Sequence, residues 1–289
     1  GLRYNMNDLR TYCSTELQDK LKLALYLSFG ILVMEIIGGV LSNSLALVSD
    51  AGHVFGDVLA IGLGYLAIRL SCRPATKGAS YGLHRAEILA ATINGLTLIV
   101  MAGVIFYEAY HRLQSPPIVK SEQMMLIAVI GLFGNLFVAT RLSGYKDLNV
   151  RGAYLHVLGD TLSSIAVICG GIWMMFTGSY VVDPILSALI GGMVAVGSIR
   201  LLRESADILM EKAPRSISPE EVSKSICTIE GVNGVHDLHI WSVCSNIHAL
   251  SAHVAVVSMN LEDANKLMNQ INTLLREQFG IAHTTLQFE

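Results

Sequence analysis

The sequence predicts a membrane protein with six transmembrane helices followed by a small α+β domain. One observation is composition: 52% of the 289 residues are hydrophobic and only 15% are charged, whereas a soluble domain contains about 25% charged residues. The other is the distribution of charge, which is sparse between residues 21 and 210 and ordinary from 211 to 289. We therefore expect an N-terminal segment at 1–20, a transmembrane domain at 21–210 and a soluble domain at 211–289.

Composition also argues against several classes of protein. The net charge is −3 and the chain has no long basic run, so we expect no nucleic-acid partner. The five cysteines are scattered without a Cys-x-x-Cys spacing, which predicts neither a disulfide framework nor a zinc ribbon. The first twenty residues contain several charged side chains and no apolar core, so they do not resemble a signal peptide.

A helix that crosses a membrane needs about 20 predominantly apolar residues, and six stretches meet this requirement. In chain order they are Leu21–Leu41, Leu45–Leu70, Glu87–Tyr107, Gln123–Leu142, Gly152–Phe176 and Val182–Leu202. Turn-forming residues separate some of these stretches: Ser42, Asn43 and Ser44 follow the first stretch, and Pro116 and Pro117 follow the third. These six stretches are the predicted transmembrane helices.

The positions of lysine and arginine predict the orientation, because cytoplasmic loops of membrane proteins carry an excess of both residues. One side holds nearly all of them: Arg3, Arg10, Lys20, Lys22, Arg69, Arg73, Lys77, Arg85, Arg141, Lys146, Arg151, Arg200, Arg203, Lys212 and Arg215. The opposite side holds only Arg112 and Lys120. We therefore expect the N-terminus and the C-terminal domain to be cytoplasmic.

Two of the predicted transmembrane helices contain ionisable side chains at matching spacings. The second has Asp50, His53 and Asp57 in the string SDAGHVFGD, and the fifth has His156 and Asp160 in YLHVLGD. Residues four apart lie one turn apart on the same helix face. Ionisable groups inside a membrane are costly and usually functional. The repeated His-x-x-x-Asp pattern therefore predicts a site, although a single such residue would suit a packing role.

The residue types of this pattern are suitable ligands for zinc. Zn2+ takes four ligands in a tetrahedron, drawn from imidazole nitrogen, thiolate and carboxylate oxygen. Two facing helices would supply them as His53, Asp57, His156 and Asp160. Metal binding requires neutral histidine and ionised aspartate. Protons therefore compete with the metal, which predicts that metal leaves on one side while protons take its place.

Two further acids in the predicted helices are assigned supporting roles. Asp50 lies three residues before His53 and is interpreted as an extra ligand, a proton relay or a helix-start cap. Glu35 lies in the first predicted helix. It is interpreted as a hydrogen-bonding bridge between helices, or as a proton-carrying or supporting group.

Beyond Pro214 the pattern changes to that of a small soluble domain. Ser218 followed by Pro219 and two glutamates is typical of a helix start. Alternating and β-branched residues predict strands, and a capped amphipathic run predicts a second helix. The expected elements are strands at Val235–Val243 and Ala249–Val257, a helix at Leu261–Phe279 and a strand at Thr284–Phe288. This order, α-β-β-α-β, predicts a sheet with one covered face.

The soluble domain contains histidines that raise the question of a second metal site. His236 and His239 lie three apart on one predicted strand, so we expect them on opposite faces. A pair across two strands, His236 and His253, joined by Glu289, would form a metal site. The alternative is that these histidines are surface or hydrogen-bonded side chains. His248, near the predicted hairpin turn, is interpreted as a bystander.

At these motifs the sequence resembles the cation diffusion facilitator family, the zinc transporters of the ZnT and CzcD type. The resemblance covers all but about the first twenty residues, and the matching strings are SLALVSDAGHVFGD, YGLHRAEILAATINGL, NVRGAYLHVLGD, LLRESADILM, GVHDLHIWSV and ALSAHVAV. It implies a homodimer of six-helix protomers with a ferredoxin-like, metallochaperone-like cytoplasmic domain. It also implies metal/proton antiport that exports zinc, with cadmium or cobalt as further substrates.

The resemblance also implies roles for particular residues. By motif match the transport ligands are His53, Asp57, His156 and Asp160, and the tail ligands are His236, His253 and Glu289, with His239 or His283 as neighbours. The short string SGYKDLN between the fourth and fifth helices lacks a histidine-rich insertion. This implies a bacterial-type protein of the inner membrane.

Two other functional classes would use the same residues. An intramembrane metalloenzyme would need an open coordination position and a general base beside the metal. The chain has no His-Glu-x-x-His motif, and Asp50 is the one candidate base. A metal sensor anchored by its helices would not need paired ligands in two of them. Transport is therefore the favoured interpretation, with zinc as substrate rather than as a catalytic cofactor.

Overall fold

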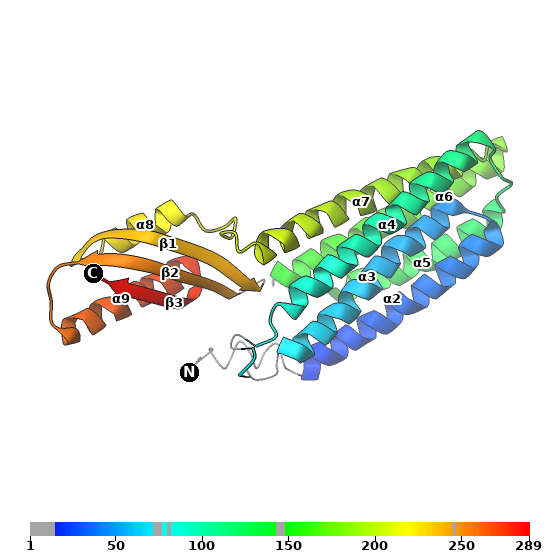
Figure 1. Ribbon diagram of the computed structural model, residues 1–289. Coiled ribbons are helices and arrows are strands. Elements are labelled where there is room, and N and C mark those ends of the chain that lie inside the picture. The colour runs from blue at the N-terminus through cyan, green and yellow to red at the C-terminus, as the bar shows by residue number, and fades with distance from the viewer. Residues whose placement is uncertain (1–14, 72–76, 80–81, 143–147, 245–246) are drawn as a thin grey trace. The chain divides into compact units, whose positions relative to one another are not determined.

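The computed structural model describes residues 15–71, 77–79, 82–142, 148–244 and 247–289 (Figure 1). The chain divides into two compact units. The first consists of Gly1–Cys72 with Ile93–Leu201, and the second of Arg73–Thr92 with Leu202–Glu289.

Long helices make up the first unit. They are α2 (Thr15–Ser42), α3 (Leu45–Ser71), α4 (Ala86–Gln114), α5 (Ser121–Leu142), α6 (Leu148–Thr177) and α7 (Val182–Leu209), the last residues of α7 and the first of α4 belonging to the second unit. Each of these helices contains one predicted apolar stretch in full. Within the described residues, four segments are long and apolar enough to cross a membrane: Leu25–Ser42, Ala86–Gln114, Asp160–Thr177 and Val182–Leu209. Helix α5 adds the shorter apolar segment Ser121–Phe137.

Helix α4 extends beyond the stretch that its apolar residues predict. The prediction ended at Tyr107, where polar residues begin, but the helix continues to Gln114. In this last part the Arg112 Nε donates to Glu108 Oε1 at 3.0 Å, one turn away, which supports helical backbone. The helix ends just before Pro116, since the residue preceding a proline is disfavoured in helical conformation.

Close helix packing organises the first unit. Helix α2 lies against α3 and α5, α5 lies against α6, and α3 meets α6. A Cβ atom at Gly38 of α2 would lie 2.6 Å from Ile127 of α5, and one at Gly171 of α6 would lie 2.4 Å from Met125. These glycines allow the backbones to approach, as small residues do between membrane helices.

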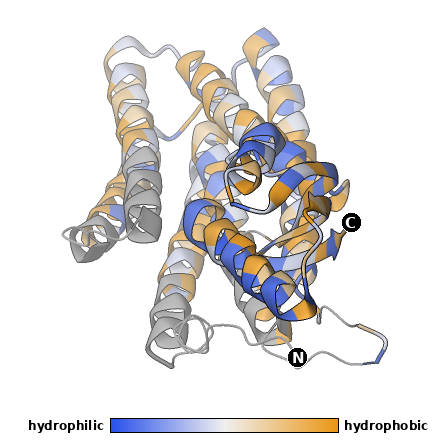
Figure 2. Ribbon diagram, turned by 90° about the vertical axis from the view of Figure 1, so that its left-hand side faces the viewer, coloured by the Kyte–Doolittle hydropathy of each residue, from blue (hydrophilic) through white to orange (hydrophobic). Residues whose placement is uncertain are grey.

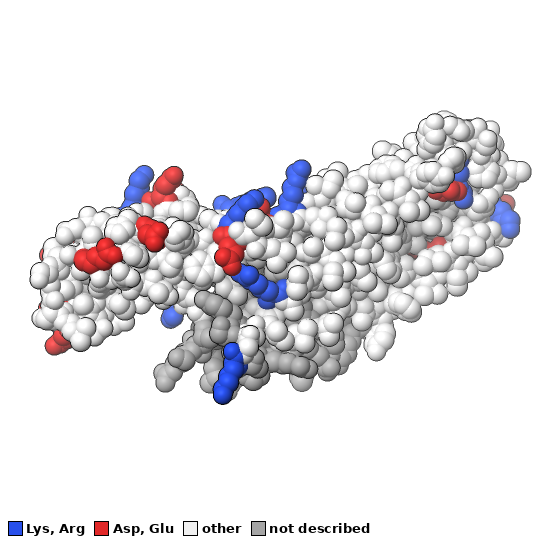
Figure 3. Space-filling view, in the orientation of Figure 1, with Lys and Arg blue, Asp and Glu red and all other residues white. Residues whose placement is uncertain are grey.

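The outer surface of the helical unit is apolar. Many large hydrophobic side chains point away from the protein, including Phe176 at 88% exposure and Val40 at 70%. Hydrophobic residues run along the outer faces of the helices (Figure 2). Charged side chains are sparse over the same surface in the view of Figure 3. A surface of this kind suits lipid contact, since membrane helices need apolar faces rather than a wet exterior.

The second unit is an α+β domain with a three-stranded sheet. Its elements are α8 (Pro219–Cys227), β1 (Val232–Cys244), β2 (Ile247–Val256), α9 (Leu261–Phe279) and β3 (Ile281–Phe288). The sheet order is β1-β2-β3, with β1 antiparallel to β2 and β2 parallel to β3, so α9 is the crossover between parallel strands. The predicted α-β-β-α-β order is confirmed, although β1 and β3 begin three residues earlier than predicted.

Helix caps delimit α8 and α9, and the cap at Ser218 and the stop at Gly280 agree with the sequence. Ser218 accepts a hydrogen bond from the Glu221 amide at the start of α8. Asn260 caps α9 in the same way, and Gly280 ends it in the left-handed conformation with φ 67°.

Both helices cover one face of the sheet and enclose the core of this unit. Its buried residues are Ile217, Val222, Ile226, Ile240, Leu250, Ala252, Val254, Leu267, Ile271, Leu275 and Ile281. In β2, Leu250, Ala252 and Val254 alternate toward this core. The side chains of Ser251 and His253 between them therefore lie on the open face of the sheet.

Replacing Leu275 by alanine should lower the free energy of unfolding of the second unit by about 2–5 kcal/mol, because the side chain is fully buried in this core. Urea unfolding is followed by the fluorescence of Trp241 in a Trp173→Phe background. The control is Leu261→Ala on the same helix, where the side chain is 79% exposed and about 0.5 kcal/mol or less is expected. Equal effects of the two substitutions would contradict this core assignment.

Candidate metal centres

The first candidate centre lies between α3 and α6. His53, Asp57 and Asp160 each offer one ligand atom, and these atoms all lie within 4.8 Å of one another. The His53 Nε2 and Asp160 Oδ1 atoms are 3.0 Å apart. Helical spacing aligns His53 with Asp57 on α3, and the contact of α3 with α6 brings Asp160 to them. Three of the four residues of the repeated pattern are thus shown to converge.

The fourth residue of the pattern is His156. It belongs to α6 and precedes Asp160 by one helical turn. That spacing places both residues on one helix face. The side chain of His156 itself lies outside the described residues.

Asp50 joins α3 to α6 beside the first centre. It is buried, and it accepts a hydrogen bond from the Ser163 hydroxyl on α6. It is not part of the group of three ligand atoms among the described residues. The interpretation as a helix-start cap is wrong, because α3 begins at Leu45 and Asp50 lies more than a turn inside it. The hydrogen bond to Ser163 ties together the two helices that carry the ligands.

Glu35 is buried on α2 with 1% exposure. Its Oε2 atom has no hydrogen-bond partner among the described residues. Helix α2 packs against α3 and α5 rather than contributing to the group of ligand atoms. The expected hydrogen-bonding bridge between helices is therefore not made through this oxygen.

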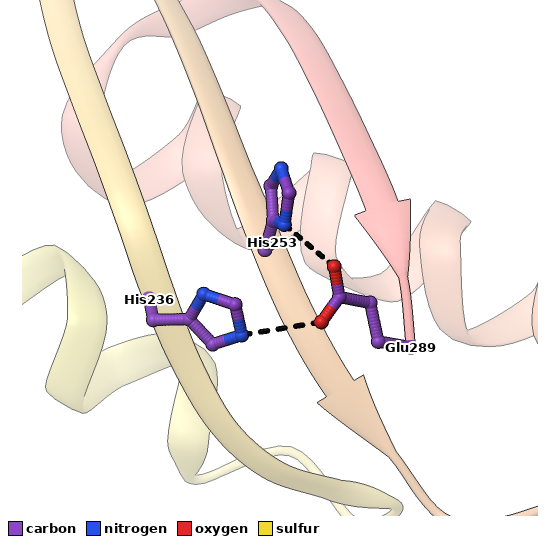
Figure 4. A group of neighbouring side chains, drawn as sticks. All are labelled: His236, His253 and Glu289. Carbon is purple, nitrogen blue, oxygen red and sulfur yellow. Dashed lines mark ion pairs between the residues drawn. The ribbon is translucent and has the colours of Figure 1, made fainter.

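The second candidate centre lies on the open face of the C-terminal sheet (Figure 4). His236 of β1, His253 of β2 and Glu289, just beyond β3, offer ligand atoms within 4.8 Å of one another. The Glu289 carboxylate lies between the imidazoles: Oε2 is 3.3 Å from His236 Nε2, and Oε1 is 2.6 Å from His253 Nδ1. All three side chains are at least one-third exposed, with 57%, 33% and 41% exposure.

Strand register explains this second arrangement. His236 and His253 are direct partners in the antiparallel pair of β1 and β2, where facing side chains lie close together. The parallel pairing of β3 with β2 continues into Glu289, whose amide donates to Val254 O at 3.0 Å. Strands β1 and β2 and the residue that follows β3 therefore each place one candidate ligand on the same face.

A β-bulge in β1 changes the position of His239. His236 pairs with His253 and His239 pairs with Ser251, so three residues on β1 span two on β2. His253 and Ser251 share the open face, and so do their partners. The expectation that His236 and His239 lie on opposite faces is therefore wrong, because strict alternation does not hold across a bulge.

The bulge also introduces Asp237, a residue that sequence reasoning missed. Asp237 has φ 50° within the bulge. Its Oδ1 is 3.1 Å from His239 Nε2, and its Oδ2 is 3.8 Å from His253 Nε2. The one signal in the sequence was that Asp237 directly follows the candidate ligand His236. Strict alternation would have placed these two neighbouring side chains on opposite faces of the sheet.

The remaining histidines of the domain stay outside the group of ligand atoms among the described residues. His248 Nδ1 lies 3.1 Å from Ser242 Oγ, and burial lowers the pKa of this histidine. Burial lowers the pKa of His283 as well, with a smaller contribution from the charge of His84. A lowered pKa favours neutral imidazole, so these two residues behave as half-buried side chains of the domain.

Both centres have the chemistry of a divalent-cation site. Each combines imidazole nitrogen with carboxylate oxygen, which are the oxygen and nitrogen ligands that zinc takes in proteins. The first centre has two carboxylates to one described imidazole, and the second has two imidazoles to one carboxylate. The first is enclosed by apolar helices, whereas the second faces solvent.

Known protein families and proteins match this sequence over nearly the whole chain. Residues 21–210 match the family model described as "Cation efflux transmembrane domain", and residues 214–289 match "Cation efflux protein, cytoplasmic domain". The metal cation efflux system protein CzcD of Cupriavidus metallidurans is 41% identical, over 93% of this chain and 85% of that protein.

Two further relatives carry transport names. The cadmium, cobalt and zinc/H(+)-K(+) antiporter of Bacillus subtilis is 39% identical, over 90% of this chain and 85% of that protein. The zinc transporter ZitB of Escherichia coli is also 39% identical, over 90% of this chain and 83% of that protein. These relatives are named as efflux systems and transporters and not as enzymes. The chain belongs to the cation efflux family of membrane transporters.

Proposed function

We propose that this protein exports zinc from the cytoplasm by secondary active transport in exchange for protons, with cadmium and cobalt as further substrates. The observation that carries the proposal is the convergence of His53, Asp57 and Asp160 where α3 meets α6. The names of the relatives, which include zinc, cadmium and cobalt transport and an antiporter, support the choice of ions.

The transport site would consist of His53, Asp57, His156 and Asp160. His156 supplies the fourth ligand, since it lies one turn from Asp160 on the same helix. Two neutral imidazoles and two carboxylates complete a tetrahedral set, and the charges of the two carboxylates balance the double charge of the ion. Asp50 supports this site through its hydrogen bond to Ser163, and Glu35 is assigned a supporting or proton-carrying role.

The contacts at this site support exchange with protons. The atoms His53 Nε2 and Asp160 Oδ1 lie at hydrogen-bonding distance, which requires a proton where the metal would bind. Zinc displaces that proton, and a proton displaces zinc, because the ligands must be deprotonated to hold the metal. Opposite movements of the two ions across the membrane are then coupled.

The C-terminal domain would bind zinc through His236, His253 and Glu289. The convergence of these ligands from two strands and the residue that follows β3 supports a built site. His239 and Asp237 would lie beside it on the same face, and His283 remains a neighbour suggested by family resemblance.

Assembly and location complete the proposal. We assign a cytoplasmic segment at 1–20, six transmembrane helices in 21–210 and a cytoplasmic domain at 211–289, with both termini in the cytoplasm. The protein would act as a homodimer in a bilayer, which the name of the matched C-terminal model, ZT_dimer, supports. Bacterial relatives support the bacterial inner membrane as the location.

Replacing Asp160 by alanine should abolish transport, because it removes a charged ligand from the first centre. We expect zinc flux into proteoliposomes with an imposed pH gradient to fall by at least about 100-fold, more than loss of an outer-shell partner costs. The matched control is Glu122→Ala, an exposed acid in the first turn of α5, which should transport as the parent does. Parental flux in Asp160→Ala would refute the assignment of this site.

Replacing His253 by alanine should weaken zinc binding by the C-terminal domain by at least about 100-fold, more than loss of an outer-shell partner costs. Calorimetric titration of the full chain is performed in the Asp160→Ala background, where the membrane site is disabled. His248→Ala serves as the control, because His248 bonds Ser242 and lies outside the ligand group. Binding should also weaken at lower pH, because protons compete with the metal for these ligands. Unchanged affinity in His253→Ala would exclude the second centre.

A further inference from the structure

Asp183 at the start of α7 caps a different helix. Its carboxylate is fully buried at 0% exposure. It accepts a hydrogen bond from the Ser44 hydroxyl, from the Leu45 amide at 2.8 Å and from the Ala46 amide at 3.2 Å. Amides in the first turn of a helix have no partner within the helix. Asp183 thus satisfies the N-terminus of α3, where a negative charge is also favourable.

Arg112 of α4 also binds the backbone just before the start of α3. Its Nη1 donates to the Asn43 carbonyl at 2.8 Å and lies 3.9 Å from Asp183 Oδ2. The Asn43 side chain in turn donates to the Ile118 carbonyl at 3.2 Å. We call Asn43, Ser44, Arg112 and Asp183 the α3 clamp. It lies at the end of the unit where α2 connects to α3 and α6 connects to α7 (Figure 1).

The burial of α3 changes at the first metal centre. Between the clamp and His53 its residues are buried, except Val48: Leu45, Ala46, Leu47, Ser49, Asp50, Ala51 and Gly52. Beyond His53, Val54 and Gly56 are still buried, and from Asp57 onward the helix opens: Asp57, Val58 and Leu59 are partly exposed and Ala60 is exposed. Protein therefore covers the helix on the clamp side of the centre and leaves it more open on the other side.

We propose that Asp183 closes the metal path at the clamp end by holding the first turn of α3, and that release of metal at this end requires these bonds to break. The inference rests on the proposed transport through the first centre, since alternating access must open that centre toward each end in turn. Leu45 precedes His53 by eight residues, or about 12 Å of helix. Asp183 is therefore a positioning residue and not a ligand.

The donors around Asp183 make a specific substitution informative. Both carboxylate oxygens accept hydrogen bonds, and a guanidinium lies nearby. In Asp183→Asn an NH2 group would replace one acceptor and face donors, and the negative charge would be lost. Glu108→Gln is the matched control, because Glu108 pairs with the same Arg112 at 3.0 Å but belongs to α4 and makes no contact with the first turn of α3 among the described residues.

Cysteine labelling tests closure directly. The five native cysteines are replaced by serine, and Leu47→Cys places a thiol at a buried position between the clamp and His53. A membrane-impermeant maleimide is added to right-side-out and to inside-out vesicles, so that the side is measured. Asp183→Asn should raise the labelling rate at least tenfold from one side only, and Glu108→Gln should leave it unchanged. Parental labelling in Asp183→Asn, or an equal rise from both sides, would overturn the proposal.

Zinc binding and flux separate a positioning role from a general structural one. In the His253→Ala background, Asp183→Asn should bind zinc at the first centre within threefold of the parental affinity, while its maximal flux falls at least tenfold. Loss of affinity equal to that of Asp160→Ala would overturn the proposal. If Asp160→Ala transports normally, the proposed function fails, but the labelling of Leu47→Cys still reports whether Asp183 closes this end.

Discussion

The contact between α3 and α6 is the interaction on which the first candidate centre depends. The two helices carry all the described ligands of the first centre, and His53 and Asp160 face each other across their contact. The buried bond between Asp50 and Ser163 fixes their relative rotation one turn away. The residues of α3 alone, or of α6 alone, would not complete a cation site, because a tetrahedral site needs donors from more than one direction.

Much of the helical unit could be predicted from composition and spacing, because membrane helices are apolar throughout and their polar residues stand out. The His-x-x-x-Asp repeat identified three candidate ligand residues that the structure brings together. The role of Asp183 could not be found in this way, since Ser44 and Asp183 lie 139 residues apart. A capping carboxylate from another helix leaves no local pattern in either segment.

The C-terminal domain shows a different limit. The order of its helices and strands along the chain followed from alternation and turn signals, and the cross-strand pairing of His236 with His253 was one of two alternatives that the sequence left open. The bulge at Asp237 did not follow from such signals, because an extra residue in a strand is not marked by hydropathy when its neighbours are polar. That single residue reverses the face of His239 and places an acid beside the second centre.

The glycines between the helices limit how this protein can vary in evolution. At Gly38 and Gly171 an added methyl group would collide with Ile127 and Met125, although neither glycine bears any chemistry. By contrast, among the described residues no atom outside the local helix backbone lies within 4 Å of a Cβ at Gly30 or Gly62, so an added methyl group would meet no such collision there. Among homologous sequences, glycine should therefore be retained at positions where two helices pack closely, whether or not these positions lie near the metal centres.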